Sequence, residues 1–362
     1  MSAAPGDAGD AAAPRTWRRA LLTTACALAG FALTAAGAAC LVPWPAELGL
    51  RAKWEHWERH HDEYDAVIFG SSFSQYGLDP VALDAALAAT GVAERTFNFA
   101  VPGMNAYEMD HLLRRALACK PAGLRRVLVE TVSWGVPTGS WVEGDFHARA
   151  IRWHSPRETL SVLDALRRAD GLGLAWLADA SVHLRLMAQR LLNHAQGPAV
   201  LAALAGRDDP FTYLQPGDLA TRQGFRPLLE ADSDEIAQRR AHFLSDGWRD
   251  YRRRLPEIDR ENRLTADVVQ PNEPAAVAQR DLLLATGAQV TWYVPPADAG
   301  AASFHALGER GVLPALLAYN SPSRYPELYR VEARFDRGHL NAGGAALWSA
   351  LLAQDLARPG TH

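Results

Sequence analysis

The sequence predicts an α/β protein built on a parallel sheet, preceded by one apolar segment near the N-terminus. Short apolar runs that resemble buried strands alternate with stretches of helical period, which is typical of parallel strands joined by crossover helices. Hydrophobic residues make up 48% and charged residues 22% of the 362 positions. Both fractions are typical of globular domains, so a disordered chain is not expected.

The charge balance and the cysteine and histidine patterns exclude several function classes. The chain has 37 basic and 41 acidic residues and a formal charge of −4, which argues against a nucleic-acid partner. Its three cysteines contain no CxxC pair, so neither a disulfide framework nor a redox motif is predicted. The twelve histidines form no HxH or HExxH motif, and we predict neither a metal nor a cofactor.

The apolar segment is predicted to be a single-pass transmembrane anchor. Residues 21–42 carry no charge and are long enough to cross the hydrocarbon layer as a helix, while Arg18 and Arg19 precede them. Positive charge on this side predicts a cytoplasmic tail over residues 1–20 and an extracytoplasmic domain over residues 46–362.

Two alternatives to an uncleaved anchor remain. A signal peptide would be cleaved near Ala36-Gly37-Ala38, although the apolar run exceeds the usual length. A lipoprotein attached at Cys40 fits less well, because Gly37 stands where a larger aliphatic residue is expected. In every case Cys119 has no soluble partner and is expected to be a buried thiol.

The elements of the soluble part follow in order. A helix over residues 48–64 carries Trp54 and Trp57 three apart, a stripe that we expect to pack on the domain. Strands and helices then alternate, until the strand pattern stops after Trp134. The predicted strands are residues 66–69, 96–101, 126–131 and 289–294, and the predicted helices between the first three are residues 80–90 and 107–118.

Residues 136–285 form a largely helical insertion between the third and fourth strands. Its clearest helical patterns cover residues 160–168, 174–192 and 235–255. We interpret this insertion as a cap over the carboxyl edge of the sheet, where ligand sites of α/β proteins form.

Two short motifs carry candidate chemistry. The first strand runs into Gly70-Ser71-Ser72 and then a helix, an arrangement that presents a serine nucleophile or, alternatively, N-caps a helix with a serine pair. Asp336 and His339 lie three apart before a C-terminal helix over residues 345–356. In a tight turn Asp336 can hold the Nδ1–H of His339 and leave Nε2 to deprotonate a serine. The alternatives for this pair are an exposed surface turn and a metal ligand.

These motifs, in this order, resemble the SGNH/GDSL hydrolase superfamily over residues 65–134 and 288–356. They are most similar to its membrane-anchored periplasmic members that O-acetylate or D-alanylate envelope polymers. The resemblance implies a three-layer, flavodoxin-like sheet, a location in the inner (plasma) membrane, and a catalytic triad. In that triad Ser72 matches the nucleophile, His339 the base and Asp336 its orienting acid.

The sequence matches only part of the oxyanion hole that the family uses. Gly103 matches the family glycine whose N–H joins that of Ser72, but residues 130–135 lack the asparagine of the next family block. Asn105 is the candidate substitute, unless it serves only the turn. Glu130, inside the third strand, is either a structural carboxylate or a support for the site.

Three aromatic residues are candidates for substrate binding: Trp134, Trp292 and Tyr293. Their faces suit sugar rings, although packing in the core explains them equally well. We therefore predict acyl transfer, with acetyl the expected group, through acyl-Ser72 to an envelope or exported polysaccharide. The family context adds an integral membrane acyltransferase as a partner. The alternatives are a carbohydrate esterase and a non-catalytic glycan-binding scaffold, with a metal-dependent hydrolase as a distant third.

Overall fold

The computed structural model describes seven stretches of the chain. They are residues 13–138, 140–144, 147–194, 197–205, 214–229, 232–264 and 270–358. The first twelve residues of the predicted cytoplasmic tail therefore lie outside the described residues.

A five-stranded parallel sheet forms the centre of the domain, which confirms the predicted α/β class with a parallel sheet. The strand order is β2-β1-β3-β4-β5, the order of flavodoxin-like doubly wound sheets. The strands are β1 (Ala66–Phe69), β2 (Thr96–Asn98), β3 (Arg126–Glu130), β4 (Gln289–Val294) and β5 (Leu316–Ala318). The sequence analysis missed β5, because three half-buried residues are too few to show a strand period.

Helices cover both faces of the sheet, as the alternation of side chains along the strands requires. Val67 and Phe69 of β1 face one layer, and Ile68 faces the other. The first layer holds α2 (Leu50–His60), α5 (Ala106–Ala118), α14 (Glu273–Leu284) and α15 (Ala302–Glu309). The second layer holds α4 (Pro80–Ala89), α13 (Trp248–Asn262) and α16 (Ala342–Leu356).

Each layer contributes a fully buried tryptophan to its core. Trp57 of α2, on the predicted stripe, and Trp348 of α16 are both 0% exposed. Large aromatic side chains contribute strongly to the apolar area buried in a core, so these two residues tie the outer helices to the sheet.

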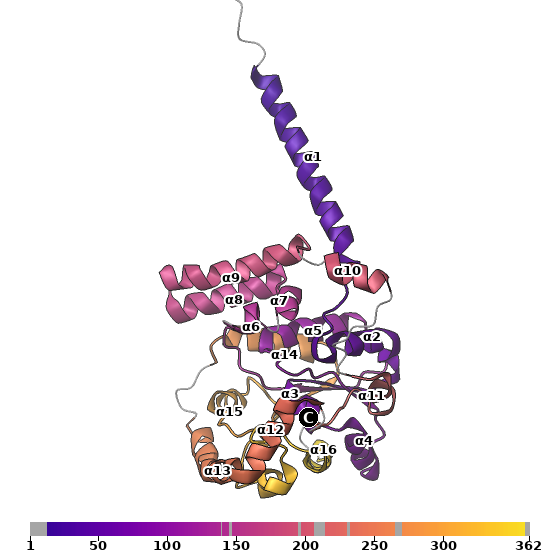
Figure 1. The fold of residues 1–362 in the computed structure, drawn as a ribbon, viewed down its shortest axis with the longest axis vertical. Helices are drawn as coiled ribbons and strands as arrows, with labels where there is room; N and C mark the ends of the chain where they lie inside the picture. Colours follow the sequence, from indigo (N-terminus) through magenta and orange to yellow (C-terminus); the bar gives the residue numbers. More distant parts are fainter. Residues whose placement is uncertain are drawn as a thin grey trace, which may run out of the picture.

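The helical insertion divides into two parts. The first contains α6 (Ser140–Glu143), α7 (His147–Trp153), α8 (Pro156–Asp170), α9 (Leu174–Leu191) and α10 (Gly197–Leu204). The second contains α11 (Pro216–Thr221), α12 (Asp234–His242) and a π-helical turn, η4 (Phe243–Gly247), before α13. Figure 1 shows the first part on the side of α5 and α14, and α12 and α13 at the other end of the domain. The interval 136–285 thus covers two faces, and its last helix, α14, packs against β4 as an ordinary crossover helix.

The N-terminal helix α1 (Ala13–Ala39) projects from the domain (Figure 1). Its Trp17–Ala39 portion is long and apolar enough to cross a membrane, and none of its most apolar window is buried. The helix begins and ends earlier than the predicted anchor over residues 21–42. Pro43 and Pro45, which cannot continue a helix without loss of hydrogen bonds, follow its end.

The cysteines differ in part from expectation. All three are free, and Cys26 and Cys40 are exposed on or beside α1. Cys119 is only half-buried, so the expectation of a buried thiol is wrong. It lies at the C-cap of α5, where a helix end meets solvent.

Candidate active site

Ser72 is the first residue of a short helix, α3 (Ser72–Gly77), that follows β1. Ser71 is the N-cap, and its side chain accepts a hydrogen bond from the Phe73 amide at 3.4 Å. The two readings of the serine pair thus apply to different residues: Ser71 caps the helix, and Ser72 is presented beyond the cap. Only glycine fits before them, because a Cβ on Gly70 would lie 2.5 Å from Glu130 Oε2.

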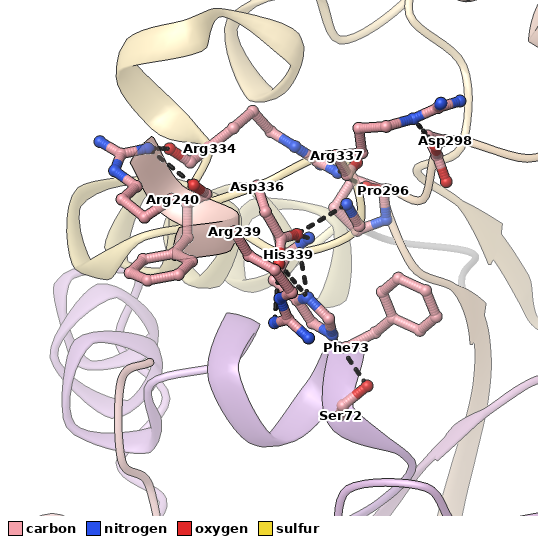
Figure 2. A network of polar contacts seen from close by, with 12 residues as sticks. Ser72, Phe73, Arg239, Arg240, Pro296, Asp298, Arg334, Asp336, Arg337 and His339 are labelled. Carbon is pink, nitrogen blue, oxygen red and sulfur yellow. Dashed lines mark hydrogen bonds and ion pairs between the residues drawn. The ribbon is translucent and has the colours of Figure 1, made fainter. Parts of the chain in front are cut away.

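His339 connects the two distant motifs of the sequence (Figure 2). Its Nε2 lies 3.0 Å from Ser72 Oγ, and its Nδ1 lies 3.0 Å and 3.2 Å from the two carboxylate oxygens of Asp336. A carboxylate accepts hydrogen bonds, so Nδ1 carries the proton and Nε2 is the acceptor for the Ser72 hydroxyl. The three predicted catalytic side chains therefore form one hydrogen-bonded chain.

The turn from Asp336 to His339 is fixed by its own backbone. Asp336 Oδ1 accepts hydrogen bonds from the amides of Gly338 at 2.8 Å and His339 at 2.7 Å. Asn341 caps α16 directly after it, by accepting from the Gly344 amide at 2.9 Å. The spacing of three residues thus lets one carboxylate close the turn and orient the imidazole.

Asp336 is held in its ionised form. Burial opposes ionisation, but the hydrogen bonds and positive potential from His339, together with Arg239, outweigh it and hold the pKa of Asp336 well below its usual range. Arg239 of α12 contributes an ion pair with Oδ2 at 2.9 Å (Figure 2). An ionised acid at this place stabilises a protonated imidazole.

Two aromatic side chains of α3 pack on the His339 ring. Phe73 stacks on it with the ring centroids 5.5 Å apart, and Tyr76 meets it edge-on at 5.5 Å. The sequence analysis did not single out either residue. Their spacing of three places them on one side of the helix that begins with Ser72, which is the only local signal for this contact.

Glu130 lies in a buried polar network around Ser71, next to Ser72. It is 2% exposed and accepts from the Ser71 amide at 2.9 Å, from Ser71 Oγ at 2.5 Å and from Ser74 Oγ. Burial raises the pKa of Glu130, against the lowering by these hydrogen bonds. Tyr293, predicted to line a pocket, instead places its hydroxyl 2.7 Å from Ser74 Oγ and is 0% exposed.

The other two aromatic candidates also lie in the core. Trp292 is 2% exposed among the apolar residues of the first layer. Trp134 is 5% exposed and packs edge-on against Tyr107. Neither of them lines the cleft at His339, although Trp134 borders a separate cavity of about 160 Å³. A strand pattern identifies an aromatic residue near the sheet edge, but packing decides whether it faces a cleft.

The loop after β2 carries the two remaining oxyanion candidates. Gly103 has a φ of 70°, a left-handed conformation that favours glycine. Asn105 caps α5 by accepting from the Glu108 amide at 2.9 Å, while its buried Nδ2 has no acceptor among the described residues. The Val101 amide donates to Gly70 O at 3.0 Å, which ties this loop to the turn before Ser72.

A cleft of about 330 Å³ opens beside the turn from Asp336 to His339, the candidate catalytic turn. Its wall combines Asp336, Arg337 and His339 with residues of the insertion, namely Arg239, His242 and Phe243. Phe243 begins the π-helical turn η4, and such turns occur frequently at functional sites. Sequence motifs gave no signal for these insertion residues, because only the fold brings α12 to the catalytic turn.

The described residues contain no group of three or more histidine, cysteine or acidic side chains that suits a metal ion. No protein-family model matches this chain, and no curated protein matches it. The resemblance to SGNH hydrolases therefore rests on the residues themselves and on the order in which they occur.

Proposed function

We propose that this protein is a membrane-anchored SGNH-type acyltransferase that moves an acyl group, with acetyl as the expected one, through Ser72 to a polysaccharide hydroxyl. The observation that carries the proposal is the contact of Ser72 Oγ with His339 Nε2 at 3.0 Å, with Asp336 on the other side of the imidazole. A nucleophile, a base and an orienting acid within hydrogen-bond reach form the constellation used for nucleophilic acyl transfer.

The first half-reaction forms an ester on Ser72. Its Oγ attacks the carbonyl carbon of the acyl donor while the hydroxyl proton passes to His339 Nε2. The tetrahedral intermediate then collapses, the bond to the leaving oxygen breaks, and His339 returns the proton to that oxygen. The negative charge of Asp336 stabilises the imidazolium between these two transfers.

The second half-reaction repeats these steps with the acceptor. A hydroxyl of the acceptor gives its proton to His339, its oxygen attacks the ester carbonyl, and Ser72 leaves with the proton from His339. The proposed donors to the oxyanion in both halves are the amides of Ser72 and Gly103. The buried Asn105 Nδ2, which has no acceptor among the described residues, supports its role as a third donor.

The cleft beside His339 supports a hydroxyl-rich acceptor. Arg239 and Arg337 bring guanidinium groups to its wall, whereas Phe243 is buried in the core of the second layer. Planar guanidinium donors suit the hydroxyl rim of a sugar ring. We therefore place the polysaccharide in this cleft and not at Trp134, Trp292 or Tyr293.

The proposed location is the extracytoplasmic side of the inner membrane. The arginines in the first turns of α1, before its uncharged stretch, support a cytoplasmic N-terminus by the positive-inside rule, and α1 is long enough to span. In this arrangement the acyl group would come from the cytoplasm through an integral membrane acyltransferase. A soluble esterase activity would be the same chemistry with water as the acceptor.

The test begins with covalent labelling of the purified full-length protein by a fluorophosphonate. We expect labelling of wild type, no labelling of Ser72→Ala, and full labelling of Ser181→Ala, an exposed serine of α9. Absence of labelling in wild type, together with inertness toward activated acetyl esters, would rule out catalysis and favour the scaffold alternative. With an acetyl donor and a glycan acceptor present, acetyl-glycan indicates a transferase, and free acetate alone indicates an esterase.

A further inference from the structure

A second cavity lies at the base of α1, away from the catalytic turn. It has a volume of about 590 Å³ and is enclosed by the last turns of α1, by α7 and by the end of α9. Three arginines from three helices line it: Arg115 of α5, Arg152 of α7 and Arg190 of α9. Most of the other lining side chains are small or apolar, among them Ala35 and Ala39 of α1.

The three arginines lack the acidic partners that arginines in this protein usually have. Among the described residues no carboxylate lies within ion-pair distance of any of them, whereas Arg114, next in the chain, pairs with Asp110 at 2.7 Å. Arg152 stacks over the Trp44 ring at 4.3 Å, and its Nε is buried without an acceptor among the described residues. Among the residues that the structure describes, the one polar side-chain contact of Arg190 is with the imidazole of His111, at 3.5 Å.

The mutual effect of these charges is unfavourable. Burial, together with the positive charges of Arg190 and Arg115, lowers the pKa of Arg152 to about 10, against an opposing effect of Glu58. Burial also lowers the pKa of Arg190, in part offset by Glu158. A bound anion stabilises three like charges around one cavity. Its oxygens accept hydrogen bonds from the guanidinium N–H groups, which have no carboxylate partner among the described residues.

The position of the cavity relates it to a membrane. Trp17–Ala39 contains 23 residues, about 35 Å of helix at about 1.5 Å per residue, against about 30 Å of hydrocarbon. The helix exceeds the hydrocarbon by about one turn, so the last turn of α1 lies at the level of the lipid headgroups when the helix spans. Asn193, just after α9, donates to Ala35 O at 2.6 Å and fixes the end of α9 at this level.

The outer side of α9 is apolar and unpartnered. Figure 1 shows α8, α9 and α10 on the side of the domain from which α1 leaves. Four leucines of α9 are exposed at spacings that place them on one face, and Leu174 is 87% exposed. They are Leu174, Leu177, Leu184 and Leu191. An apolar helix face beside basic side chains is typical of a helix that lies in a membrane interface.

We propose that the three-arginine cavity binds the phosphate of an anionic membrane lipid, with the leucine face of α9 against the acyl chains. This inference rests on the membrane anchorage in the proposed function and is independent of the acyl-transfer chemistry. The consequence is a fixed orientation of the domain. In Figure 1, α12 and α13 lie in the part of the domain far from α1, so the cleft that α12 lines is held at a distance from the membrane.

The experiment measures how much phosphatidylglycerol the full-length protein retains in detergent, by native mass spectrometry during titration with the lipid. We expect wild type to bind phosphatidylglycerol in preference to phosphatidylcholine. Arg115→Gln should weaken this binding about fivefold, and Arg152→Gln with Arg190→Gln about 25-fold, at about one fivefold step for each charge. Because Arg115 is exposed, its variant keeps the test valid if the double variant fails to fold.

The matched control is Arg249→Gln with Arg253→Gln on α13, whose side chains are 65% and 80% exposed. It should bind the lipid as wild type does. Equal lipid binding by wild type and Arg115→Gln would overturn the proposal, and so would equal affinity for the two lipids. Displacement of the lipid by millimolar inorganic phosphate would assign the cavity to soluble anions instead. Ser72→Ala should retain lipid binding, which separates this outcome from a failure of the proposed acyl transfer.

Discussion

The carboxylate of Glu130 binds both the amide and the hydroxyl of Ser71, the residue immediately before the proposed nucleophile. The two contacts measure 2.9 Å and 2.5 Å, and they join the carboxyl ends of neighbouring parallel strands, β3 and β1. The turn that presents Ser72 is thus positioned from the adjacent strand. This buried group is the part of the site on which several predictions depend.

Replacement of Glu130 should cost both stability and reactivity. Glu130→Ala leaves the Ser71 amide and two serine hydroxyls without their acceptor and opens a void, so the free energy of unfolding should fall by about 3 kcal/mol or more. Urea denaturation measures this change, and the rate of fluorophosphonate labelling reports the position of Ser72. Ser74→Ala removes only one of the donors and should cost about 1 kcal/mol. An equal loss in the two variants would contradict the assigned network.

Asp336→Asn should leave the fold intact and slow acylation of Ser72 by roughly 10⁴-fold, because an amide no longer fixes the productive imidazole tautomer. Stopped-flow acylation with an activated acetyl ester measures the rate. The comparison variant is Arg239→Gln, which removes the exposed ion-pair partner of Asp336. Its side chain is 44% exposed, so we expect less than a tenfold decrease. A similar decrease in both variants would mean that Asp336 acts mainly as a salt-bridge partner.

Gly70→Ala should destabilise the protein by about 3 kcal/mol or more and abolish labelling of Ser72. The added Cβ would lie 2.5 Å from Glu130 Oε2. This oxygen belongs to a buried hydrogen-bond network and cannot move away without breaking its hydrogen bonds. Gly217→Ala on the exposed surface of α11 meets nothing within 4 Å and should stabilise the helix slightly. Thermal unfolding and labelling of the two variants provide the measurement. Wild-type labelling by Gly70→Ala would show that the turn adapts.

Acidification should destabilise the domain through a buried histidine pair in the insertion. His154 Nδ1 lies 2.5 Å from Ala150 O, and its Nε2 lies 2.9 Å from His183 Nδ1. Burial lowers the pKa of His154 to about 3 and that of His183 to about 4. In the folded protein the pKa values of both histidines lie below the value near 6.5 of an unfolded histidine. The stability of the fold with this neutral pair is therefore fully present above about pH 6.5. It is lost progressively as the pH falls toward 4.

Between pH 7.5 and pH 5 the free energy of unfolding should fall by about 2 kcal/mol for each histidine. Urea denaturation at the two pH values measures this difference. His183→Asn should reduce this pH dependence by about that amount, whatever its effect on stability at neutral pH. His194→Gln, at an exposed site, should keep the wild-type dependence. If His183→Asn shows the full loss, the acid sensitivity has another source.

Local pattern was enough to predict much of the sheet. The bounds of β1 and β4 agree with the predicted strands, because short runs that are wholly or mostly apolar are typical of strands covered on both faces. The same logic failed for β5, whose three residues are half-buried. It also failed for Trp292 and Tyr293, since alternation along a strand assigns two faces but does not say which face meets a cleft.

The sequence by itself determined the fold class, the apolar N-terminal helix and the identity of the three triad candidates. Strand periodicity, segment length and short turn motifs are local properties, so they can be read without knowledge of the fold. Only the tertiary structure brought Ser72 to His339, placed Arg239 on Asp336 and gathered three arginines around one cavity. These relationships join residues far apart in the chain, and packing of the helical layers and of the insertion decides them.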